Sequence, residues 1–142
     1  MNLIFRALLC FAFMQLAWGD TVHLRDRGSE INGTVTFSNG IFHVKALFKK
    51  GARDISVGRD GVSEVRFNEV KDNPEDDAPD WMLHLSTQST PPKAEDAIRF
   101  WDSKDNDVNG SLETITTDAI SVQGKQSKQS FVKNKVRAVV LQ

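Results

Sequence analysis

Ile31-Asn32-Gly33-Thr34-Val35 recurs later in the chain as Val108-Asn109-Gly110-Ser111-Leu112, with apolar, Asn, Gly, hydroxyl and apolar residues in the same order. The similarity extends back to Asp20 and Asp96, each of which opens an apolar alternation, and forward to 62–68 and 136–142. Self-similarity of this kind indicates that one supersecondary unit has been duplicated. We therefore expect two copies of a similar structure.

The apolar residues within the first copy recur at every second position, which is the period of a β-strand. The pairs are Val22 and Leu24, Val35 and Phe37, Phe42 and Val44, Ile55 and Val57, and Val65 and Phe67. Turn-forming residues separate these pairs at the spacing of tight hairpins. Gly33 and Gly110 lie inside strand patterns, where a missing side chain allows a sharp bend. The sequence therefore predicts an all-β fold of short antiparallel strands.

An order of about five strands, with a glycine-bent second strand and a last strand that follows a brief turn at Gly61-Val62, resembles the SH3-like and Sm-like small barrels. The resemblance covers residues 20–68 and, more loosely, 96–142, where 102–107 form a longer charged loop. In those families the fold mostly supports binding of peptides, cell-wall glycans or RNA, and rarely catalysis. The resemblance implies two tandem antiparallel five-stranded barrels, at 20–68 and 98–142.

Residues 1–19 have the pattern of a secretory signal peptide. Arg6 precedes an apolar run over 7–18, which is shorter than the about 20 residues that span a bilayer, and small residues occupy positions 17 and 19. We expect cleavage before Asp20, export to a periplasmic or extracellular location and no transmembrane segment in the mature chain. Cleavage would remove Cys10, the only cysteine, and with it any disulfide, thiolate metal site or cysteine nucleophile.

Residues 69–97 are predicted to be an acidic, proline-containing linker between the copies. Within it, the alternation of Trp81, Leu83 and Leu85 predicts a short strand at 81–85 that packs on a barrel. Residues 119–142 are instead basic and contain no acidic residue; their cations are Lys125, Lys128, Lys133, Lys135 and Arg137. Three interpretations stay open: the stretch binds an anionic glycan, a lipid head group or nucleic acid, the acidic linker neutralises it, or its lysines protect an edge strand from aggregation.

A possible calcium loop begins at Asp105, where Asp107 and Asn109-Gly110 follow at the spacing of alternating oxygen ligands. Glu113 occupies the ninth position, but Thr116 stands where a bidentate carboxylate is required. Asn109-Gly110 also repeats Asn32-Gly33, so a solvated hairpin loop is the competing interpretation.

Other polar residues also have two interpretations. Asn32-Gly33-Thr34 and Asn109-Gly110-Ser111 match the N-glycosylation pattern, but a structural Asn-Gly turn explains the repetition equally well. His23, His43 and His84 each lie between apolar neighbours and are expected on outer faces, either as ordinary surface residues or as a joint zinc or copper site.

The sequence contains no Gly-x-Ser-x-Gly, glycine-rich phosphate loop or His-Glu-x-x-His motif. Its 18 basic and 19 acidic side chains nearly balance, which gives no electrostatic argument for nucleic acid. We therefore expect an exported, non-enzymatic binding or assembly module whose partner is another protein or an envelope glycan. Its expected contact surface is a groove between the copies formed by Trp81, Trp101 and His84. The alternative is a calcium-responsive structural protein that uses Asp105, Asp107, Asn109 and Glu113.

Overall fold

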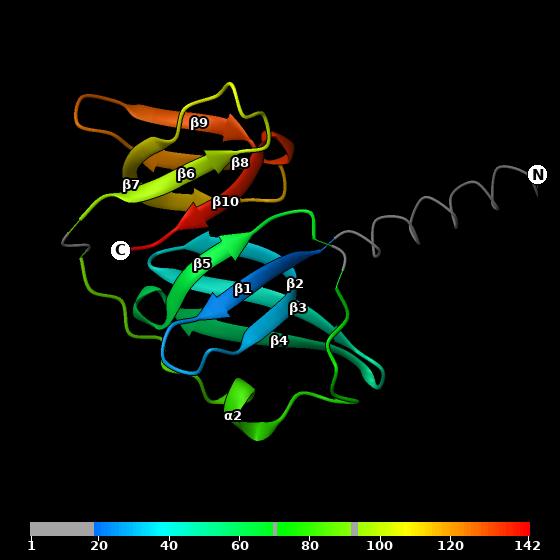
Figure 1. The fold of residues 1–142 in the computed structure, drawn as a ribbon. Coiled ribbons are helices and arrows are strands. Elements are labelled where there is room, and N and C mark those ends of the chain that lie inside the picture. The colour runs from blue at the N-terminus through cyan, green and yellow to red at the C-terminus, as the bar shows by residue number, and fades with distance from the viewer. Residues whose placement is uncertain (1–18, 70, 92–93) are drawn as a thin grey trace, which may run out of the picture.

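A computed structural model describes residues 19–69, 71–91 and 94–142, which form one sheet of ten antiparallel strands with almost no helix (Figure 1). The first five strands are β1 (Asp20–Leu24), β2 (Glu30–Ser38), β3 (Ile41–Phe48), β4 (Gly51–Gly58) and β5 (Val62–Arg66). The second five are β6 (Asp96–Phe100), β7 (Val108–Ile115), β8 (Ala119–Gln123), β9 (Lys128–Val132) and β10 (Val136–Val140). None of the helices in the described ranges is long and apolar enough to cross a membrane. The predicted signal peptide, apart from Gly19, lies outside the described residues.

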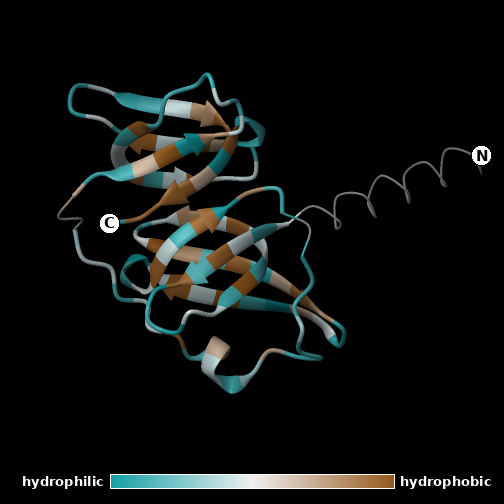
Figure 2. Cartoon of the chain, viewed as in Figure 1, coloured by the Kyte–Doolittle hydropathy of each residue, from teal (hydrophilic) through white to brown (hydrophobic). Residues whose placement is uncertain are grey.

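Each copy contributes five strands in the same order, β5-β1-β2-β3-β4 in the first and β10-β6-β7-β8-β9 in the second. A 3-10 turn precedes the last strand of each copy, η1 (Arg59–Gly61) and η2 (Lys133–Lys135). All ten alternating apolar positions predicted in the first copy are buried. Figure 2 shows the alternation of hydrophobic and hydrophilic residues along the strands. The all-β prediction is confirmed.

An approximate twofold axis relates the two copies. β5 pairs with β10, and Val65 lies opposite Val139, which is its equivalent in the repeat. β2 also meets β7, where Phe37 lies opposite Ile115. These two residues are equivalent because they pair with Phe42 and Ile120 across matching hairpins. Equivalent residues face each other at both contacts, as at the twofold interface of a symmetric dimer.

The two copies share one sheet and one hydrophobic core. Because β2 meets β7, the six central strands form a closed circuit, β2-β1-β5-β10-β6-β7. The buried apolar side chains form a single cluster that includes Val22 and Ile31 from the first copy and Ile98 and Ile120 from the second. The second copy begins at Asp96 in β6, two residues before the predicted start at 98.

The predicted strand at 81–85 is wrong. Helix α2 spans Asp80–Leu83, and no strand pairing includes these residues. Met82 is buried, whereas Leu83 is 42% exposed. The side chains that pack in or against the core are Ala78, Trp81, Met82 and Leu85, which follow the spacing of a helical face. The two-residue period of the apolar residues therefore predicted a strand where a short helix forms.

Gly33 and Gly110 are positions where another backbone passes too closely for a side chain. A Cβ atom on Gly33 would lie 2.9 Å from the Ala46 Cα and would also collide with the Lys45 carbonyl oxygen. A Cβ atom on Gly110 would lie 2.8 Å from the Gln123 carbonyl oxygen. The repeated Asn-Gly motif is thus explained by the close approach of the neighbouring strand in each copy.

We predict that Gly33→Ala lowers the free energy of unfolding by about 3 kcal/mol, because the neighbouring β3 backbone must move to admit the methyl group. Gly110→Ala should have a similar effect. Thr34→Ala, on the exposed side of the same strand, is the control and should change stability by less than about 1 kcal/mol. Urea unfolding measures all three, and equal midpoints for Gly33→Ala and Thr34→Ala would contradict this explanation.

Candidate functional site

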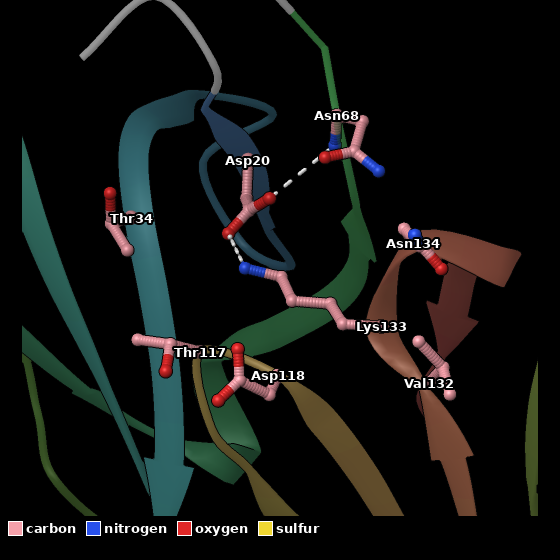
Figure 3. Close-up of a pocket in the computed structure, with 8 residues that line it drawn as sticks. All are labelled: Asp20, Thr34, Asn68, Thr117, Asp118, Val132, Lys133 and Asn134. Atoms are coloured by element: carbon pink, nitrogen blue, oxygen red, sulfur yellow. Dashed lines mark hydrogen bonds and ion pairs between the residues drawn. The ribbon is translucent and has the colours of Figure 1, made fainter. Parts of the chain in front are cut away.

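Two buried ion pairs join the copies, and each takes one residue from each copy. Lys133 Nζ lies 2.9 Å from Asp20 Oδ2 (Figure 3), and Arg59 Nη2 pairs with Asp96 Oδ1. Asp20 and Asp96 begin equivalent strands, β1 and β6. Arg59 and Lys133 begin the equivalent turns η1 and η2. The approximate twofold axis therefore exchanges one ion pair with the other.

Each aspartate also accepts hydrogen bonds from two backbone N–H groups at equivalent positions. The donors to Asp20 are Val35 at 3.1 Å and Asn68 at 3.4 Å, and those to Asp96 are Leu112 at 2.9 Å and Gln142 at 3.3 Å. Both aspartates are almost completely buried, so their carboxylates depend on these partners in place of water. Loss of either cation would leave a buried carboxylate without its counter-charge.

A cavity lies beside each ion pair. The cavity at Lys133 has a volume of about 330 Å³ and is lined by residues of both copies, including Thr34, Thr117, Val132 and Asn134 (Figure 3). The cavity at Arg59, of about 550 Å³, is lined by Ser111 and by Asn39 and Gly40, among others. Ser89, Thr90 and Pro91 of the linker also line the second cavity. The linker thus borders one of two related cavities.

The acidic part of the linker binds the β3–β4 hairpin of the first copy. The Lys50 N–H donates to the Asp76 carbonyl oxygen at 3.0 Å, and Lys49 Nζ lies 3.6 Å from the Asp76 carboxylate. Arg53 donates two hydrogen bonds to the Asp77 carboxylate, at 2.9 and 2.8 Å. These bonds are the main reason that the pKa of Asp77 is lowered to about 2. Basic side chains at this hairpin therefore hold an acidic segment.

The following part of the linker, 86–90, lies extended along the end of β4 and η1. The Gly58 N–H donates to the Ser86 carbonyl oxygen at 2.8 Å, and the Asp60 N–H donates to that of Gln88 at 3.3 Å. Thr90 donates to Asp60 Oδ1 from its N–H at 2.9 Å and its hydroxyl at 3.0 Å. From the first carbonyl bond to the second, the donor moves from residue 58 to 60 and the acceptor moves from 86 to 88. The segment therefore runs parallel to this edge. A Cβ atom on Gly58 would collide with the Gln88 carbonyl oxygen.

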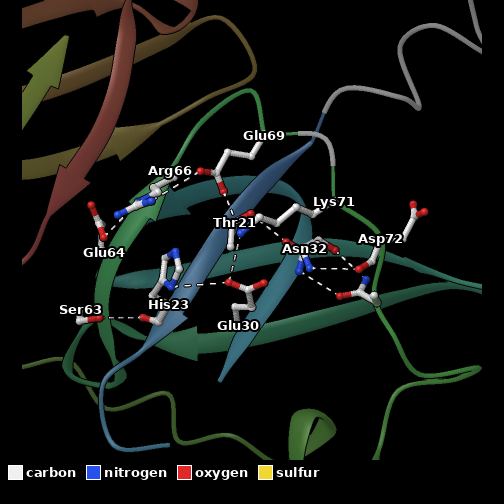
Figure 4. Close-up of polar contacts among 11 residues, drawn as sticks. Thr21, His23, Glu30, Asn32, Ser63, Glu64, Arg66, Glu69, Lys71 and Asp72 are labelled. Carbon is white, nitrogen blue, oxygen red and sulfur yellow. Dashed lines mark hydrogen bonds and ion pairs between the residues drawn. The ribbon is translucent and has the colours of Figure 1, made fainter. Parts of the chain in front are cut away.

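Asn73 fixes the beginning of the linker against β2. Its Oδ1 accepts from the Asn32 N–H at 3.0 Å, and its Nδ2 donates to the Asn32 carbonyl oxygen at 2.9 Å. Asn32 itself is buried, and its Oδ1 accepts from the Thr21 hydroxyl at 2.8 Å (Figure 4). Of the two predicted glycosylation positions, the folded chain therefore exposes Asn109 and buries Asn32.

The three histidines lie in separate contacts. His23 Nδ1 is 3.7 Å from Glu30, in a network that continues to Lys71 (Figure 4). His43 contacts the Ser56 hydroxyl, and the His84 ring contacts a backbone oxygen of α2. Within the described ranges, no group of three or more His, Cys, Asp or Glu side chains is placed to hold a metal ion.

Two of the three predicted contact residues, Trp81 and His84, lie at helix α2. Trp81 stacks on Arg27 of the first copy, with the guanidinium carbon 4.5 Å from the ring centroid. His84 Nδ1 lies 2.8 Å from the Asp80 carbonyl oxygen, at the end of the same helix. Trp101 belongs to the second copy, follows β6 and is 50% exposed. The groove predicted from these three residues stays a prediction.

The residues of the predicted calcium loop face separate partners. The Asp107 carboxylate lies 3.6 Å from Arg99, and the Glu113 carboxylate lies 2.7 Å from Lys128. Asp105 donates its backbone N–H to the Asp102 carbonyl oxygen, and Asn109 pairs with Ala97 in the sheet. The positions of these residues in the structure add no support for a calcium site. The calcium interpretation therefore stays a prediction.

Sequence reasoning recognised Asp20 and Asp96 as repeated positions but missed their partners, Arg59 and Lys133. The signal that could have found them is the basic residue that stands three positions before Val62 and Val136 in the two copies. A cation and an aspartate that recur together indicate a pair, although the sequence does not show that each pair crosses between copies.

We predict that Arg59→Met and Lys133→Met each lower the free energy of unfolding by about 3 kcal/mol or more, because each leaves a buried carboxylate without its cation. Double-mutant cycles measured by urea unfolding should give a coupling of about 2 kcal/mol between Arg59 and Asp96. The matched control is the cycle of Arg59 with Asp20, which should give nearly zero. Coupling in the control cycle instead would show that the ion pairs form within each copy.

The Asp77 contact makes the linker sensitive to acid. Its pKa is lowered from 3.8 to about 2, so the bond to Arg53 contributes fully above pH 4 and is lost as the pH falls toward 2. We expect the NMR resonance of the Trp81 indole, which reports on the docked linker, to shift over this range. In the Asp77→Asn variant, the part of this change that comes from Asp77 should be missing. An unchanged titration in that variant would refute the assignment.

Comparison with protein-family models, with curated proteins and with solved structures finds no match to this chain. Its function is therefore argued from the geometry described above.

Proposed function

We propose that this chain is an exported, non-enzymatic binding module of two SH3-like small barrels that binds extended polypeptide segments. The barrel assignment is supported by the strand order of each copy and by the 3-10 turn before its last strand, both of which the family resemblance implies. A fold that presents strand edges and shallow cavities recognises partners by addition of an extended chain.

One observation carries the proposal, namely that the first copy holds an extended segment of its own linker. Residues 86–90 are held through two backbone carbonyl oxygens, which accept from Gly58 and Asp60, and through Thr90, which donates to the Asp60 carboxylate. This mode of recognition uses the peptide backbone, which a glycan does not have. It therefore favours a protein partner over an envelope glycan.

The export part of the proposal is supported by the position of Asp20. Cleavage before this residue would leave β1 complete and keep the carboxylate that pairs with Lys133. Cleavage even one residue later would remove that carboxylate and break one of the two crossed ion pairs. The predicted cleavage position is thus compatible with the fold.

We predict that the purified chain retains extended peptides from a displayed random library and leaves fragments of cell-wall glycan unbound, because its donors fit a peptide backbone. The measurement is isothermal titration with the selected peptides and the glycan fragments, and the peptide ends should be unchanged by mass spectrometry. Binding of glycans alone, or cleavage of the peptides, would contradict the proposal. Mass spectrometry of the exported chain should also find Asp20 as its first residue.

A further inference from the structure

The second copy has the same edge as the first, but no described segment covers it. β9 is the last strand of the sheet and pairs only with β8 among the described strands. Its Val132 is equivalent to Gly58, because they pair with the equivalent residues Ala119 and Ile41. Gly58 is buried beneath the linker, whereas Val132 is 55% exposed. The linker thus covers the edge of the first copy, and the related edge of the second copy stays open.

The open edge presents the same backbone donors as the covered edge. The Lys133 N–H donates to the Asp118 carbonyl oxygen, as the Arg59 N–H donates to that of Gly40. The N–H of Val132, the residue before this bond in β9, points the opposite way, toward the edge, and Asn134 in η2 is equivalent to Asp60 in η1. Val132 and Asn134 therefore correspond to the donors Gly58 and Asp60. Among the described residues, the N–H groups of Val132 and Asn134 make no backbone hydrogen bond outside the strands and helical turns.

The open edge also has a basic hairpin where the first copy has one. In the first copy, Lys49 and Arg53 contact the carboxylates of Asp76 and Asp77. In the second copy, the β8–β9 hairpin carries Lys125 and Lys128, whose side chains are 87% and 61% exposed. Lys128 pairs with Glu113, and Lys125 reaches only Glu95, at 4.0 Å. This hairpin is suited to an acidic segment of another chain.

We infer that the edge formed by β9 and η2 binds an extended acidic peptide segment of a partner protein. The segment runs parallel to β9, one of its carbonyl oxygens accepts from the Val132 N–H, and its carboxylates lie near Lys125 and Lys128. Side chains on its inner side face the cavity of about 330 Å³ beside Lys133. This inference rests on the proposed function and adds the place and the charge of the partner.

The structure offers a substitution that removes one donor with little strain. Val132 has a φ of −65° and an extended ψ, which proline adopts readily. Its N–H points away from β8, so Val132→Pro removes no hydrogen bond of the sheet. Val132→Ala is the matched control, because it shortens the side chain and keeps the N–H.

The probe is a synthetic peptide with the sequence of residues 72–91, because this acidic segment already binds the equivalent edge. We expect it to bind the full chain in fluorescence anisotropy, with affinity about tenfold weaker for Val132→Pro and within about threefold for Val132→Ala. Lys125→Glu with Lys128→Glu should also weaken binding at least tenfold. A control peptide with Asn and Gln in place of Asp and Glu should bind the unchanged chain more weakly than the acidic peptide does.

NMR of the labelled chain locates the site. Shifts at Val132 and Asn134 support the inference, whereas shifts only at Gly58 and Trp81 would show that the probe displaces the linker and would overturn it. Sedimentation that shows self-association lost in Val132→Pro would identify a second copy as the occupant and also overturn it. If library peptides bind the chain but Val132→Pro leaves every affinity unchanged, the inference fails and the proposed function stands. If no peptide binds, both fail.

Discussion

The crossed ion pairs are the constraint on which the rest of the structure depends. Asp20 begins β1 and Lys133 leads into β10, while Asp96 begins β6 and Arg59 leads into β5. When each aspartate takes its cation from the other copy, β5 and β10 lie side by side in a fixed register. Apolar burial alone tolerates other registers of similar strands, whereas a buried carboxylate without its cation does not. The ion pairs therefore select the arrangement in which the copies share one sheet.

Much of the fold could be predicted from the sequence because each copy repeats the same local signals. The two-residue period identified ten buried apolar positions of the first copy, and the repeated glycines marked where neighbouring strands approach. The relation between the copies could not be predicted, since a repeat shows equivalence and not contact. Asp20 and Asp96 were visible as a matched pair, but only the structure shows that Lys133 serves one and Arg59 the other.

The linker was harder to predict because its structure is set by the surface on which it lies. Trp81, Leu83 and Leu85 alternate as in a strand, yet a short helix forms here, and its face with Met82 contacts the core. Neutralisation of the basic end of the chain by the acidic residues was one of the interpretations left open by the sequence, and in the structure Asp77 is bound to Arg53 of the first copy. The charge of the acidic linker suits either of the two basic hairpins, so charge alone does not explain which one it binds. Chain connectivity explains why the linker binds the hairpin of the first copy.

The differences between the two edges indicate how they are used. Gly58 and Gly40 lack side chains where the linker lies against the backbone, which suits an occupant that stays in place. Val132 and Asp118 stand at the equivalent positions, so another chain cannot lie as close, although the backbone donors face the same way. Such a chain makes fewer close contacts per residue. The first edge is thus built for a permanent occupant, and the second for an exchangeable one.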